Sequence, residues 1–83
     1  MQAEDILKKT IQRIHGAYAP STIRAYQTDA AAFIQFCKSR QLESLPAQAI
    51  SVFLFIEHLA EKNLSVASIR RAIAGISKIH QIN

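Results

Sequence analysis

Two cations in the last part of the chain, Arg71 and Lys78, stand among unusually small side chains. At 3.6 residues per turn, a helix places both on one line with Ala67 and Ala74, and Gly75 lies beside that line. Solvated helix faces usually carry long Glu, Lys and Gln side chains, whereas this line holds nothing larger than a methyl group besides its cations. Short side chains let a helix approach a surface while the cations reach ahead of it. The pattern is therefore compatible with contact with a polyanion.

The major groove of DNA, about 12 Å wide, accepts a helix presented in this way. The guanidinium of Arg71 has the fork geometry that pairs with O6 and N7 of guanine, and Arg70 and Lys78 are placed to contact phosphates. An alternative interpretation remains open. Paired arginines are common on solvated helices, and Gly75 would equally permit close packing against another helix.

A second candidate contact lies in the stretch APSTIRAY, where Ser21, Thr22 and Arg24 fall in a first helical turn. The amides of a first turn have no intrahelical acceptors, so together with two hydroxyls and a guanidinium they would bind a phosphate. Serine and threonine are also favoured there simply as helix caps. Two basic helix faces in one small chain favour nucleic acid as the partner.

Composition is compatible with this view and excludes several classes of protein. The 83 residues predict one domain, the hydrophobic content of 49% is that of a folded protein, and the formal net charge is +4. Cys37 is the only cysteine, so no internal disulfide or cysteine-based zinc site can form, and it is predicted to be a small buried hydrophobe. The histidines at 15, 58 and 80 lack a metal-binding spacing, and His80 is predicted to be a packed histidine with one hydrogen bond. We expect neither metal nor cofactor.

The ends and hydropathy of the chain bear on its location. The first fifteen residues contain charges throughout and lack the apolar core of a signal peptide. No segment approaches the roughly 20 apolar residues of a membrane span. We therefore expect a cytoplasmic protein without a membrane partner.

Helical periodicity accounts for nearly the whole chain, in segments 3–15, 20–39 and 47–62 and in the stretch 63–80. Gly16 and Asn63 are suited to end helices, Pro20 to open one, and Ser65 to cap one. No segment alternates like a strand, so the predicted fold is all-α, a small bundle of four helices, or five. The buried stripe of the last helix is predicted to comprise Val66, Ile69, Ile73, Ile76 and His80, with Ala72 and Ile79 at its edge.

The third segment is apolar almost all round. Ile50, Phe53 and Leu54 lie outside its main stripe, so this helix is either central or covered by something else. An alternative function follows, a helical protein–protein interaction module whose basic face is incidental.

The ordered set of segments STIRAYQTDAAAFIQFCKSR and LPAQAISVFLFIEHLAEKNLSVASIRRAIAGISKIH resembles the N-terminal, SAM-like core-binding domain of tyrosine recombinases and phage integrases. Members typically show a Ser or Thr helix start, T-x-x-x-Y, an aromatic-rich helix ending near Cys or Trp, and a Leu-Pro-Ala entry. Their last helix has the form S-x-x-T-I-x-x-x-L-x-x-I-x-x-x-H, and SVASIRRAIAGISKIH is especially similar to that of Cre-like enzymes. The resemblance covers residues 19–80.

The resemblance implies a helical domain that closes over double-stranded DNA opposite a separate catalytic domain, with its second and fourth helices in or beside the major groove. Carried over by position, it implies these contact residues: Ser21, Thr22, Arg24, Ala25, Ala67, Ser68, Arg70, Arg71, Gly75 and Lys78. It also implies assembly of the parent protein into oligomers on DNA. This chain of residues 1–83 would be the core-binding domain alone, a fragment of that parent.

Some positions depart from the family pattern. Ser68 replaces the usual threonine but keeps its hydroxyl, whereas Ala67 stands where Cre-like relatives carry lysine, which removes one groove contact. The family's catalytic arginines, lysine, histidines and tyrosine belong to the downstream domain. Tyr18 and Tyr26 are not candidates for that nucleophile, and no catalytic residue is expected in this chain.

Overall fold

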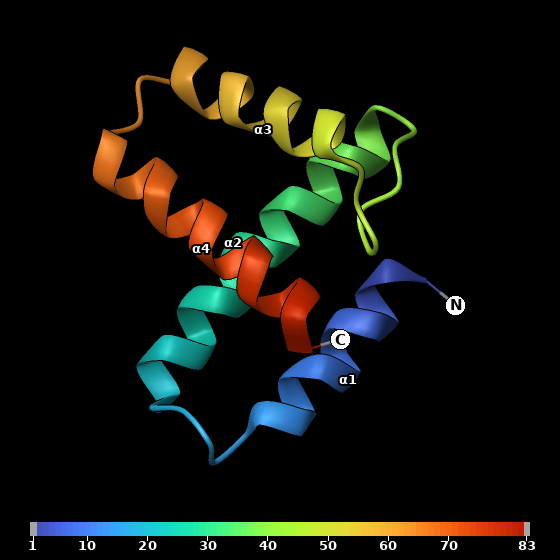
Figure 1. The fold of residues 1–83 in the computed structure, drawn as a ribbon, viewed down its shortest axis with the longest axis vertical. Helices are drawn as coiled ribbons and strands as arrows, with labels where there is room; N and C mark the ends of the chain where they lie inside the picture. The colour runs from blue at the N-terminus through green and yellow to red at the C-terminus, as the bar shows by residue number, and fades with distance from the viewer. Residues whose placement is uncertain (1, 83) are drawn as a thin grey trace.

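The computed structural model describes residues 2–82 and contains four helices within them. They are α1 (Ala3–Ile14), α2 (Pro20–Ser39), α3 (Ala49–Glu61) and α4 (Val66–Ile82). The long α2 runs through the middle, α4 crosses it, α1 packs along it, and α3 covers α4 and the end of α2 (Figure 1). The all-α prediction is confirmed, with four helices. Among residues 2–82, none of the helices combines the length and the hydropathy that a membrane span requires.

The ends of the helices follow the local signals in the sequence. Gly16 and Asn63 adopt positive φ angles, 89° and 61°, just beyond α1 and α3. Pro20 opens α2, and the Ser68 amide donates to Ser65 Oγ at 3.1 Å, so Ser65 caps α4. The third helix begins two residues later than predicted, at Ala49, after a loop with a cis peptide bond before its proline.

Two apolar clusters meet on the sides of α2. One joins α2, α3 and α4, where the ring of Phe55 lies 5.2 Å from that of Phe33 and 5.3 Å from that of Phe36. The other joins α1, α2 and α4 through Leu7, Ala30, Ile34, Leu45 and Ile79. Cys37 is fully buried, as predicted, and burial raises the pKa of its thiol, which keeps it protonated at neutral pH.

The buried side of α4 differs from the prediction. Its buried residues are Ala72, Gly75, Ile76 and Ile79, whereas Val66 is 66% exposed. The placement of Gly75 on the outward face was therefore wrong. A Cβ at Gly75 would lie 3.3 Å from the Asp29 Cβ and 3.6 Å from the Tyr26 Cα, so the two helices approach closely at this glycine. The buried side of α4 is therefore shifted toward Ala72 and Gly75, while Ile76 is buried as predicted.

His80 ties the loop before α3 to the end of α4. The Ala47 amide donates to its Nε2 at 3.1 Å, and its Nδ1 lies 2.8 Å from the Ile76 carbonyl oxygen. Because Nε2 accepts, the ring proton sits on Nδ1 and is donated to Ile76. The predicted packed histidine is present, with two hydrogen bonds instead of one.

Replacing His80 with Ala should lower the free energy of unfolding by about 1–3 kcal/mol, because the Ala47 amide loses its acceptor. Urea denaturation would measure the change. The matched control is Gln81→Ala, on the exposed neighbouring position, which should stay within about 0.5 kcal/mol of the wild type. Equal unfolding midpoints for both variants would contradict a structural role for His80.

The helix crossing gives a second prediction. Leucine at position 75 must displace α2, at a cost of about 1–3 kcal/mol or more that outweighs its better helix propensity. Leucine at the exposed position 74 meets no neighbouring helix. Thermal unfolding should therefore show Gly75→Leu to be clearly less stable than Ala74→Leu, and a reversed order would mean that the helices do not approach at residue 75.

Candidate nucleic-acid interface

The cations of α4 remain at the surface although Gly75 between them is buried. The Arg71 side chain is 65% exposed, Lys78 is half-buried, and the small residues Ala67 and Ala74 on the same line are exposed. Arg71 and Lys78 lie four residues before and three residues after Gly75, so they border the same side of the α2–α4 contact. We call these four residues, Ala67, Arg71, Ala74 and Lys78, the cationic edge.

Arg71 forms an ion pair with a buried carboxylate of α2. Its Nε lies 3.5 Å from Oδ2 of Asp29, whose side chain is only 9% exposed. Within residues 2–82, that Oδ2 has no hydrogen-bond partner. The guanidinium is therefore paired on one side and open to solvent on the other, so the ion pair does not withdraw it from the surface.

Lys78 lies over an aromatic ring at the other end of the cationic edge. Its Nζ is 5.7 Å from the ring centre of Tyr18, which contacts the ring of Tyr26 edge-on at 6.0 Å. The negative face of an aromatic ring attracts an ammonium, by about 0.5–1 kcal/mol at exposed sites. Tyr18 precedes α2, so this contact places the ammonium near the beginning of that helix.

The predicted residues of α2 divide between two sides of the helix. Ala25 lies four residues before Asp29 and therefore on the side nearest the cationic edge, where Thr22 is also half-buried; Ser21 is exposed. Arg24, five residues before Asp29, projects about 140° around the helix from it. It lines a hollow of about 470 Å³ with His15 of the α1–α2 connection. The structure therefore does not bring Arg24 alongside Arg71.

The remaining predicted residues of α4 lie at its first turn and beyond the cationic edge. Ser68 is half-buried and belongs to the cap, because its amide donates to Ser65 Oγ and the two hydroxyls are 3.0 Å apart. Arg70 is exposed but lies about 100° around the helix from Arg71, so the two guanidinium groups point in different directions.

Asp29 and Tyr18 were not predicted as parts of this site, although each touches one of its cations. A signal for Asp29 was present, because it lies three residues after Tyr26 and four before Phe33, on the apolar stripe of α2. Charged residues are almost never buried without a partner, so an aspartate on such a stripe indicates a nearby cation. No spacing in the sequence links Tyr18 to Lys78.

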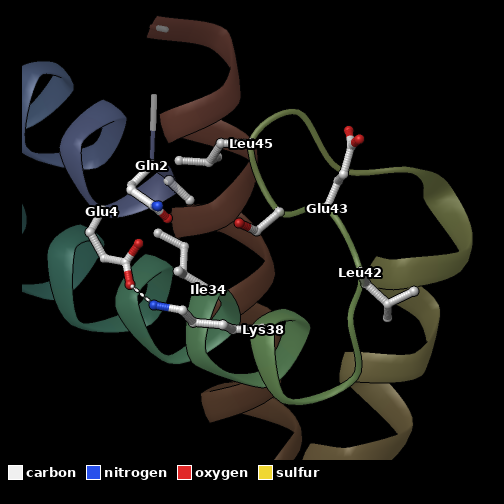
Figure 2. A pocket seen from close by; sticks show the side chains of 9 residues that line it. Gln2, Glu4, Ile34, Lys38, Leu42, Glu43 and Leu45 are labelled. Atoms are coloured by element: carbon white, nitrogen blue, oxygen red, sulfur yellow. Dashed lines mark hydrogen bonds and ion pairs between the residues drawn. The ribbon is translucent and has the colours of Figure 1, made fainter.

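A hollow of about 400 Å³ lies away from these residues, between the start of α1, the end of α2 and the loop that follows it (Figure 2). Lys38 and Glu4 meet there at 2.9 Å beside Ile34, and the hydrogen bond from Lys38 lowers the pKa of the Glu4 carboxyl. Both side chains are exposed, and such surface pairs contribute little to stability. Among residues 2–82 no group of three or more His, Cys, Asp or Glu could hold a metal ion.

Comparison with known proteins agrees with the resemblance seen in the sequence. The family model described as "Phage integrase, N-terminal SAM-like domain" matches residues 10–82. A search of curated proteins and a search of solved structures each gave no match. The matched range includes α2, α3, α4 and the cationic edge, and this domain is a component of tyrosine recombinases. The chain therefore belongs to the phage integrase N-terminal SAM-like domain family.

Proposed function

We propose that this chain binds duplex DNA through the cationic edge of α4 and the neighbouring side of α2, as the DNA-positioning part of a site-specific tyrosine recombinase. The observation that carries the proposal is the exposure of Arg71 beside side chains no larger than a methyl group. A helix edge of this kind lets the axis of α4 approach the floor of the major groove. The net charge of +4 favours the encounter with a polyanion.

Each group has a separate role in this proposal. Arg71 reads a base edge and Lys78 neutralises a phosphate, while Ser21 and Thr22 donate to the backbone from the start of α2. Arg24 and Arg70 project away from the edge and contact flanking phosphates if the duplex wraps around the domain. Base contacts set sequence preference, whereas phosphate contacts set affinity and position.

Strand cleavage and joining belong, in this proposal, to a catalytic domain downstream in the parent protein. The chain itself is not an enzyme, and it acts by holding one face of the duplex while the catalytic domain holds the other. Several copies of the parent protein assemble on DNA during DNA integration and recombination. Binding by one such domain alone is expected to be weak, because the contacts of the catalytic domain are missing.

Replacing Arg71 with Ala should weaken binding to duplex DNA by about 5- to 100-fold, because a bidentate base contact is lost. Fluorescence anisotropy of a labelled duplex at low salt would measure this loss of affinity.

Lys78→Ala should reduce the slope of log affinity against log salt by about 0.9, the value for one phosphate contact. The matched control is Lys8→Ala at an exposed position of α1, which removes one positive charge away from the cationic edge.

Two outcomes count against the proposal. If the wild type shows no binding at low salt, the chain is not a DNA-binding domain by itself. If Lys8→Ala loses as much affinity as Arg71→Ala, net charge alone accounts for the binding and the cationic edge has no special role.

A second candidate function, protein–protein interaction, is favoured by the outer face of α3. Ile50 and Phe53 are 53% and 54% exposed there, while Leu54 is half-buried against the core. Large apolar side chains exposed together often mark interaction surfaces. This function is compatible with the first, since a recombinase that assembles on DNA needs contacts between copies.

If α3 mediates association, Phe53→Asp should elute later than the wild type in size-exclusion chromatography at equal concentration. Its thermal stability should be nearly unchanged, because residue 53 is exposed and a surface change costs little. Gln35→Asp, which introduces the same charge at an exposed position of α2, serves as the control. Identical elution of all three proteins would remove self-association through α3.

A further inference from the structure

We propose that Asp29 is a positioning residue for Arg71, whose buried carboxylate holds the guanidinium at Nε and leaves its terminal nitrogens facing outward. The inference rests on the proposed DNA-binding function for its consequence, although the positioning itself can be measured without DNA. It assigns a role to a residue that has no place in the predicted interface.

The burial of Asp29 is the first step in the argument. Its side chain is 9% exposed, and within 2–82 its Oδ2 accepts no hydrogen bond. A carboxylate in such surroundings is unfavourable unless a cation compensates it. The cation within ion-pair distance is the Arg71 guanidinium, with Nε at 3.5 Å. The carboxylate therefore constrains where that side chain lies.

Gly75 makes the arrangement sterically possible. A Cβ at this position would lie 3.3 Å from the Asp29 Cβ and 3.4 Å from its Oδ2. The glycine thus leaves the carboxylate room beneath α4, one helical turn after Arg71. This explains why a helix interior retains a residue with poor helix propensity. The glycine thus serves the ion pair.

The geometry of arginine supplies the functional link. A guanidinium is planar and carries its donors in a fixed fork, so an attraction at Nε orients the two terminal nitrogens as a pair on the opposite edge. That pair matches O6 and N7 of guanine or two phosphate oxygens. An arginine oriented before binding also loses less rotamer freedom when it meets DNA. The buried carboxylate therefore promotes binding despite its negative charge.

The direction in which DNA affinity changes on Asp29→Asn distinguishes the proposal from simple electrostatics. Asp29→Asn keeps the side-chain volume and removes a negative charge, so charge alone predicts tighter binding to DNA. Positioning predicts weaker binding, by about 2- to 10-fold, the cost of ordering one long side chain. The effect should also require Arg71, because Asp29 acts only through it.

The experiment measures duplex binding by anisotropy for the wild type, Asp29→Asn, Arg71→Ala and the double variant. We expect Asp29→Asn to weaken binding in the wild-type background and to have no weakening effect in the Arg71→Ala background. The control is Asp5→Asn at an exposed position of α1, which makes the same change in net charge. This variant should bind DNA as well as the wild type or slightly better. Asp29→Ala is the second variant, used if the asparagine variant does not fold.

A second readout uses the DNA-free protein. The Nε–H resonance of Arg71, assigned by its absence from Arg71→Ala, should show restricted motion in the wild type and become mobile in Asp29→Asn. An unchanged resonance overturns the proposal, as does equal weakening in both backgrounds or binding by Asp29→Asn as tight as that of Asp5→Asn. If no protein binds DNA, the proposed function fails while the Nε–H measurement still decides the positioning.

Discussion

The close approach of α2 and α4 at Gly75 is the constraint on which the rest of the structure depends. A Cβ at this position would lie too near Asp29 to be accommodated freely. The absence of a side chain therefore sets the separation of α2 and α4, the two longest helices. Once they cross, they leave one side for α3 and another for α1, and each side is filled by its own apolar cluster. The same crossing places Arg71 and Lys78 along the border of the contact, where they stay at the surface.

Most of the helix boundaries could be predicted because their causes are local. A glycine or asparagine able to adopt positive φ, a proline without an amide, and a serine that caps its own helix act within a few residues. The rotation of α4 about its axis could not be predicted in this way. Its isoleucines recur over a wide arc, and periodicity does not show whether helices will meet through large side chains or through small ones. In the structure α2 and α4 meet through small side chains, so Gly75 is buried and Val66 is exposed.

In the candidate site too, features with local causes were predictable and features set by tertiary packing were not. The spacing of Arg71 and Lys78 follows from helix geometry, so their common edge was predictable from the sequence. Their partners were not, because Asp29 and Tyr18 come from segments about forty and sixty residues away in the chain and meet the cations only through folding. Arg24 lies apart from this edge, because it projects from another side of α2 and lines a separate hollow.

The hydrogen bond between Ala47 and His80 has a mechanical consequence. The last turn of α4 is fastened to the loop that enters α3, and the turn after Glu61 joins the other ends of the same two helices. Helix α3 is thus joined to α4 at both of its ends. Because both ends of α3 are joined to α4, we expect a displacement of α3 to move the arginine-bearing helix with it.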